Sequence, residues 1–91
     1  MEKITMKMMR ETLIAAKPWN CSEQDIYDCL RKLSDEELEQ TDIRRELKFT
    51  SLDIVDLLMR LETRSGYPTK FLYHDLAEKS NVTVSDVIAF F

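Results

Sequence analysis

The chain has 91 residues, of which 44% are hydrophobic and 33% are charged, and its formal net charge is -4. A chain of this length can bury one hydrophobic core but has too little interior for two, so we expect a single domain over residues 1–91. The apolar content excludes a disordered polymer, and the acidic balance argues against a nucleic-acid partner, whose phosphates require clustered Lys and Arg. One glycine and two prolines are too few for the tight turns of an all-β fold. The composition therefore predicts an all-α domain.

The N-terminal residues, the lengths of the apolar segments and the two cysteines indicate the cellular location of the protein. The first residues lack the unbroken apolar stretch of a secretory signal peptide, and no segment is apolar enough over a sufficient length to span a membrane. Cys21 and Cys29 are separated by a spacing that fits neither a CxxC metal pair nor a disulfide framework. We therefore expect a cytoplasmic protein with two reduced cysteines and no membrane span.

Hydrophobic periodicity and capping residues predict two helices in the first third of the chain. Apolar side chains recur at helical spacing from Lys3 to Ala16, and Pro18 ends that segment because the residue before a proline avoids the helical region. Ser22, followed by Asp25, resembles a capping box, and an apolar stripe continues from there to Leu33. This second segment is expected to form the next helix.

The elements on either side of the middle of the chain are shorter. Ser34 with Glu37 repeats the capping pattern, but mostly charged residues come after it, which predicts only a short helical turn within a connection. A short helix is expected after Pro68. Thr83 or Ser85 could cap a final helix, and the sequence leaves both possibilities open.

The strongest helical pattern runs from Leu52 to Arg64, and Gly66 is expected to end it, because glycine readily adopts the left-handed conformation that closes a helix. The face predicted to enter the core carries Ile54, Leu57, Leu58 and Leu61. A second apolar stripe carries Leu52, Val55 and Met59. The helix is therefore apolar over more surface than one packing face requires, and we expect the second stripe to contact something other than the core.

This helix should begin at Thr50 and Ser51, where either hydroxyl could accept a hydrogen bond from an unpaired amide of the first turn. A phosphate ester would also be stabilised at this position, because the free amides and the helix dipole favour negative charge. The two hydroxyl residues by themselves leave open a simple cap and a modified serine.

The segment from Leu47 to Glu62 has the sequence LKFTSLDIVDLLMRLE. It resembles the signature around the phosphopantetheine serine of acyl carrier proteins, which reads L-G-x-D-S-L followed by an acidic, apolar helix. Ser51 matches the modified serine and Leu52 the leucine after it. The recognition helix of the family is matched at Asp53, Asp56, Met59 and Glu62. The resemblance extends from about Ile43 to Phe91.

The resemblance implies a small bundle of three longer helices and one short one. The family's first helix would be either the second predicted helix, with an N-terminal helix added, or the first, with an insertion after it. It also implies that Ser51 carries 4′-phosphopantetheine, with Thr50 and Leu52 beside it. The chain would then not be an enzyme but a monomer that carries an acyl or related group as a thioester.

The implied partners are a phosphopantetheinyl transferase and the enzymes that load and transfer acyl groups. Contacts with these partners are expected at Asp53, Val55, Asp56, Met59 and Glu62. The cargo could be fatty, polyketide, aminoacyl or sugar-linked, and the sequence does not choose among these classes.

Two positions shortly before Ser51 depart from the family pattern. Thr50 stands where the family has an aspartate, and Lys48 stands where it has a glycine. Threonine can cap the helix but cannot offer a carboxylate to the modifying enzyme. Thr63 and Arg64 also replace acidic residues, which thins the edge that basic partners recognise. The alternative interpretation is therefore a carrier-like domain that is not modified and acts as a protein-interaction module.

Overall fold

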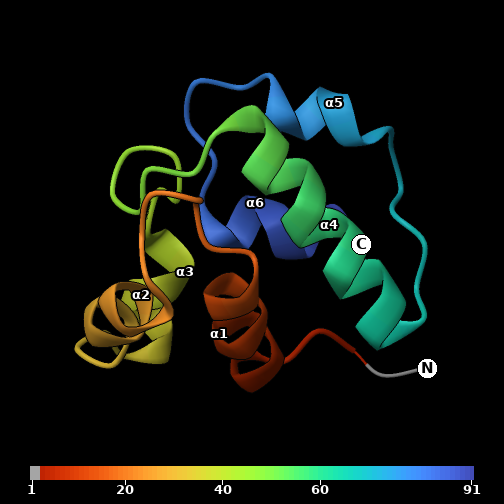
Figure 1. The fold of residues 1–91 in the computed structure, drawn as a ribbon. Coiled ribbons are helices and arrows are strands. Elements are labelled where there is room, and N and C mark those ends of the chain that lie inside the picture. Colours follow the sequence, from red (N-terminus) through yellow and green to blue (C-terminus); the bar gives the residue numbers. More distant parts are fainter. Residues whose placement is uncertain (1–2) are drawn as a thin grey trace.

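The computed structural model describes residues 3–91, and this part of the chain forms six helices and no strand beyond one isolated bridge (Figure 1). In chain order the helices are α1 (Met6–Ala15), α2 (Glu23–Leu30), α3 (Asp35–Gln40), α4 (Ser51–Ser65), α5 (Tyr73–Ala77) and α6 (Val84–Ala89). The expected all-α fold is confirmed.

Short-range capping interactions determine where most of these helices begin. In a capping box, the cap hydroxyl accepts from the amide three residues on, and that residue's carboxylate accepts from the cap amide, so two otherwise unpaired donors are satisfied. Four helices begin with such a box, at Ser22, Ser34, Thr50 and Thr83. Thr83 rather than Ser85 therefore caps α6. Gly66, with a φ of 79°, ends α4 in the left-handed conformation as predicted.

Two helices are shorter than the sequence pattern indicated. The first begins at Met6 and not at Lys3, because the Thr5 hydroxyl caps it by accepting from the Met8 amide at 3.1 Å. The second ends at Leu30 and not at Leu33. Apolar periodicity extends before the start of the first helix and beyond the end of the second, because side chains such as Ile4 and Leu33 also pack against the core from outside a helix.

All six helices contribute to one hydrophobic core. α4 crosses the middle of the molecule and packs against α1 and α5, whereas α2 packs against α1, and α3 packs against α6 (Figure 1). The predicted core face of α4 is fully buried, at Ile54, Leu57, Leu58 and Leu61. α4 is thus the element around which the others are arranged.

The connection between α3 and α4 is well ordered by hydrogen bonds. The Ile43 amide donates to the Val82 carbonyl at 2.8 Å, which ties this connection to the segment before α6. Within the connection, the Asp42 side chain accepts from the amides of Arg44 and Arg45 at 3.0 and 3.2 Å, and so turns the chain. This turn brings the Arg44 side chain next to the first residue of α4.

Candidate functional site

Ser51 is the first residue of α4 and is exposed. Its hydroxyl donates to the backbone carbonyl of Ala77, the last residue of α5, at 3.0 Å. The Nη1 group of Arg44 donates to the same carbonyl at 2.7 Å and to Ser51 Oγ at 3.1 Å. We call these three groups the Ser51 cluster. The cluster joins α4, the end of α5 and the connection that precedes α4.

Thr50, and not Ser51, caps α4. Thr50 Oγ1 accepts from the Asp53 amide at 3.3 Å and donates to Asp53 Oδ2 at 2.9 Å, and the Thr50 amide donates to that same carboxylate oxygen at 2.8 Å. The first bond within α4 runs from the Ile54 amide to the Thr50 carbonyl at 3.0 Å, so the amides of Ser51 and Leu52 have no acceptor inside the helix. The Ser51 hydroxyl is therefore not needed as a cap.

The groups around Ser51 Oγ suit a phosphate ester. Two amides without a helical acceptor, the positive end of the α4 dipole and the Arg44 guanidinium all favour negative charge at this position. None of the ion pairs within residues 3–91 involves Arg44. Ser51, Arg44 and the start of α4 could therefore hold a phosphopantetheine group.

An open depression surrounds Ser51 and combines charge with exposed apolar surface. It is lined by Trp19, Arg44, Arg45, Phe49, Thr50, Ser51, Leu52, Asp53 and Ser80. The side chains of Trp19 and Leu52 are the most exposed large apolar groups in the described residues, at 88% and 81%. Trp19 comes from the connection between α1 and α2, so a distant segment of the chain reaches the surface around Ser51.

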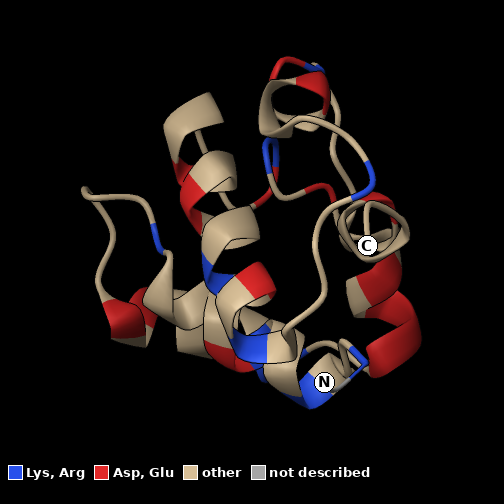
Figure 2. Ribbon diagram, turned by 90° about the vertical axis from the view of Figure 1, so that its right-hand side faces the viewer, with Lys and Arg blue, Asp and Glu red and all other residues tan. Residues whose placement is uncertain are grey.

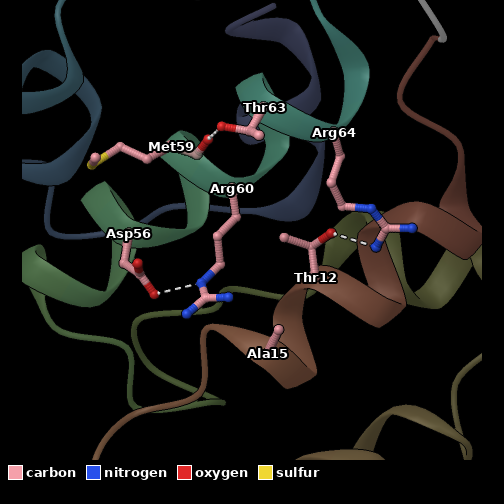
Figure 3. A pocket seen from close by; sticks show the side chains of 7 residues that line it. All are labelled: Thr12, Ala15, Asp56, Met59, Arg60, Thr63 and Arg64. Atoms are coloured by element: carbon pink, nitrogen blue, oxygen red, sulfur yellow. Dashed lines mark hydrogen bonds and ion pairs between the residues drawn. The ribbon is translucent and has the colours of Figure 1, made fainter.

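A second groove lies between α1 and α4, along the face that the sequence assigns to partners (Figure 3). It is lined by Thr12, Ala15, Asp56, Met59, Arg60, Thr63 and Arg64. Asp56 accepts from Arg60 at 2.9 Å, and Arg64 pairs with Glu11 of α1 at 2.9 Å. Carboxylates on this face are thus matched by neighbouring arginines. Figure 2 shows acidic and basic residues together on several segments, but the charged residues of α3 are all acidic.

The three acidic residues predicted to attract partners all form bonds within the chain. Asp53 completes the cap of α4, and Asp56 pairs with Arg60. Glu62 is half-buried and accepts hydrogen bonds from the Tyr73 hydroxyl and, at 3.3 Å, from the Thr69 amide. Of these three carboxylates, only Glu62 bonds to residues outside α4 and its cap, and it thereby stabilises the packing of the following segment against α4.

The hydrogen bond from Tyr73 to Glu62 also changes the chemistry of the phenol. It raises the pKa of Tyr73 above its ordinary value, because the bond stabilises the protonated phenol. Partial burial and the negative charge of Glu62 raise the pKa further. The contact links the start of α5 to the second half of α4.

The second apolar stripe of α4 divides between surface and interior. Leu52 is 81% exposed and Met59 is 51% exposed, whereas Val55 is half-buried and packs against the core. Figure 3 shows the Met59 side chain extending away from the two arginines of the groove. Leu52 and Met59 thus leave apolar surface uncovered by this chain, and contact of this stripe with a partner stays a prediction.

Sequence reasoning did not identify Arg44, Trp19 or the Ala77 carbonyl as neighbours of Ser51. Arg44 lies in a charged connection, where its sequence context resembles that of any solvated arginine. Ala77 contributes its backbone carbonyl, and every residue type has such a group, so the sequence cannot single it out. The only available signal was the short separation of Arg44 from Ser51 along the chain.

The structure also describes the cysteines, possible metal ligands and the apolar length of the helices. Cys21 and Cys29 are free thiols, the first half-buried and the second exposed. Within residues 3–91, no group of His, Cys, Asp and Glu side chains is arranged to hold a metal ion. None of the helices described in this range has the length and apolar character needed to cross a membrane.

Comparisons of the chain with models of protein families, with curated proteins and with solved structures found no significant match.

Proposed function

We propose that the protein is an acyl carrier protein and that Ser51 is the attachment site of its 4′-phosphopantetheine. The observation that carries this proposal is the placement of Ser51. Its exposed hydroxyl is the first of α4, is not required as the cap, and lies beside unpaired amides and Arg44. A phosphate ester is stabilised by such surroundings.

Two departures from the family pattern are compatible with the same backbone. Lys48 has a φ of 63°, in the left-handed region, at the position where the carrier signature has a glycine. Thr50 forms a complete capping box with Asp53, at the position of the family's aspartate. The chain therefore adopts at both positions the backbone geometry that the family residues would favour, although the residue types differ.

The order of the helices also supports the proposal. α4 corresponds to the recognition helix, α5 to the short helix and α6 to the last helix of the carrier bundle. α1 packs against α4, whereas α2 packs against α1. We therefore assign the family's first helix to α1 and regard α2 and α3 as an insertion before the signature.

The attachment forms a bond between Ser51 Oγ and the phosphorus of the pantetheine phosphate in coenzyme A. The pyrophosphate bond of coenzyme A breaks, adenosine 3′,5′-bisphosphate leaves, and the hydroxyl proton passes to a base on the transferase. Once bound, the group supplies a thiol on a flexible arm that can hold an acyl group as a thioester. The chain's own residues contribute the attachment point, the positive surroundings of the ester and the surface that partners contact.

Partner enzymes would approach along α4 and the depression around Ser51. Leu52 and Met59 offer exposed apolar surface for this contact, with Val55 between them at the edge of the core. Asp56 would contribute little to a negative field because Arg60 offsets its charge, whereas the hydrogen-bond partners of Asp53 and Glu62 are neutral and do not offset theirs. We expect a monomeric cytoplasmic carrier whose docking depends more on apolar contact than on charge.

The test is the intact mass of the protein after coexpression with a broad-specificity phosphopantetheinyl transferase, or incubation with that enzyme and coenzyme A. We expect a mass gain of one phosphopantetheine group in the wild type and no gain in Ser51→Ala. Thr50→Asp restores the missing carboxylate and should be modified at least as fast as the wild type.

Failure of several transferases to modify the wild type and Thr50→Asp would contradict the proposal. The absence of a carboxylate at Thr50 favours the second candidate function, an unmodified carrier-like domain that binds another protein. That domain would use the same exposed apolar residues, Leu52 and Met59, without a prosthetic group.

A further inference from the structure

Arg44 occupies an unusual position for a surface arginine. It is half-buried, and a single Nη group reaches both the Ala77 carbonyl, at 2.7 Å, and Ser51 Oγ, at 3.1 Å. A guanidinium has five donors in a fixed plane, so two bonds through one nitrogen leave further donors free to bind an additional acceptor. Those donors lie beside the oxygen that would carry the prosthetic group.

Modification of Ser51 would change the bonding within the Ser51 cluster. The hydroxyl has one hydrogen, which it donates to Ala77, and an ester oxygen has none to donate. The Ala77 carbonyl, at the C-terminal end of α5, would then keep Arg44 as its side-chain donor. At the same time a negatively charged phosphate would be joined to the oxygen that Arg44 already contacts.

We propose that Arg44 binds the phosphate of the prosthetic group on Ser51 and, by keeping its bond to Ala77, connects that phosphate to the end of α5. This inference rests on the proposed function. Arginine suits the role because its planar donors match phosphate oxygens and its charge persists at any physiological pH. The unmodified protein holds the guanidinium in place beforehand, which lowers the entropy cost of binding the phosphate.

Arg45 provides a matched control. It is the next residue, carries the same charge and lines the same depression. Arg45 is exposed, however, and within residues 3–91 it contributes only its backbone amide to a hydrogen bond, with Asp42. A general attraction of the phosphate to positive charge would involve both arginines, whereas the proposed contact involves Arg44.

The experiment compares thermal unfolding of the unmodified and modified forms of the full chain for the wild type, Arg44→Gln and Arg45→Gln. Intact mass establishes complete modification of each modified sample. We expect Arg44→Gln to lower the midpoint of the modified form by several degrees more than that of the unmodified form. Arg45→Gln should lower both midpoints by the same small amount.

An equal loss in both forms of Arg44→Gln would overturn the inference, because a purely structural bond to Ala77 is present with or without the phosphate. Equal extra losses in Arg44→Gln and Arg45→Gln would also overturn it, in favour of diffuse attraction. If Arg44→Gln does not fold, Arg44→Lys serves instead, together with the ³¹P NMR shift of the modified protein. This shift should differ from the wild type in Arg44→Lys and stay unchanged in Arg45→Gln, and an unchanged shift in Arg44→Lys overturns the inference.

The two proposals fail in different ways. If several transferases modify neither the wild type nor Thr50→Asp, the proposed function is wrong and this inference falls with it. If the wild type gains the mass of one group but the two forms of Arg44→Gln are equally destabilised, only the role of Arg44 is wrong.

Discussion

Lys48 has a φ of 63°, in a region where a side chain with a Cβ is crowded by the backbone. It lies in the turn that leads into α4, where Phe49 is buried and Thr50 begins the cap. The next residues determine the backbone at Lys48, because Phe49 must reach the core while Ser51 stays at the surface. The left-handed backbone at Lys48 is therefore an unfavourable conformation that the turn before Ser51 requires.

We predict that Lys48→Gly stabilises the protein. A non-glycine residue in the left-handed region costs about 1–2 kcal/mol, and the greater freedom of glycine in the unfolded chain offsets about 0.5–1 kcal/mol of that gain. The net increase in the free energy of unfolding should be about 0.5–1 kcal/mol, measured by urea denaturation. Lys48→Ala is the control, because it removes the charge but keeps the Cβ, and an equal gain in this variant would contradict the explanation.

α4 and α5 are held side by side by contacts at both ends of α5. Ala77 at its end accepts from Ser51 and Arg44, and Tyr73 at its start donates to Glu62. α5 therefore runs alongside α4 in the opposite direction. A helix this short is marginal by itself, so these two contacts and the burial of Leu76 maintain it.

The pH dependence of the Tyr73 contact tests this arrangement. The raised pKa means that the bond contributes to stability below the ordinary pKa of tyrosine and that the contribution is lost as pH rises through the raised value. We predict that Glu62→Gln lowers the pKa of Tyr73 toward its ordinary range, because the carboxylate acceptor and its charge are removed. The measurement is the ultraviolet absorbance of tyrosinate against pH, with Tyr73→Phe subtracted.

Asp56→Asn is the matched control for Glu62→Gln. Asp56 is a carboxylate on the same helix but pairs with Arg60. This variant should leave the Tyr73 titration unchanged. A Tyr73 titration that is also unchanged in Glu62→Gln would mean that the contact between α4 and α5 does not form in solution.

At the scale of the whole molecule, α1 packs against both α2 and α4, and α3 packs directly against α6. Arg10 of α1 donates to the carbonyls of Leu30 and Leu33, each at 2.7 Å, and pairs with Asp35 at 3.0 Å. The Leu30 carbonyl, at the end of α2, also accepts from the Leu33 amide at 3.1 Å, and the Leu33 carbonyl lies just beyond the helix. The Arg10 side chain thus ties the end of α2 and the segment before α3 to α1.

We predict that Arg10→Met destabilises the whole protein by about 2 kcal/mol, because a half-buried charged donor to two carbonyls is lost while the apolar stem is kept. The free energy of unfolding in urea is the measurement. Arg31→Met is the control, since the Arg31 side chain is 58% exposed and its ion pair is a local one, with Asp28 three residues before it. Equal effects of the two substitutions would show that Arg10 does not join the helices.

Capping residues in the sequence indicated where helices start, and the apolar spacing indicated which face of α4 enters the core. Ser22, Ser34 and Thr83 were each followed by an acidic residue at the spacing of a capping box, and all three cap helices. The starts predicted at Ser22 and Ser34 are confirmed, because the groups that form a cap lie within one helical turn of each other. The sequence left Thr83 and Ser85 as alternatives for the last helix, and the first helix begins at Met6 and not at Lys3. The attachment site at Ser51 was predicted from a motif of contiguous residues and stays a prediction, with which the exposed hydroxyl at the start of α4 is compatible.

The residues that surround Ser51 are determined by how separate segments of the chain pack together. Arg44, Ala77 and Trp19 meet around Ser51 only because the connection before α4, the end of α5 and the turn after α1 are folded against one another. The sequence by itself determined the helix caps, the buried face of α4 and the position of the candidate serine, because these depend on spacing along a helix. The tertiary structure alone decided that the Ala77 carbonyl and Trp19 lie near that serine and that Tyr73 bonds to Glu62, because these contacts join different segments of the chain.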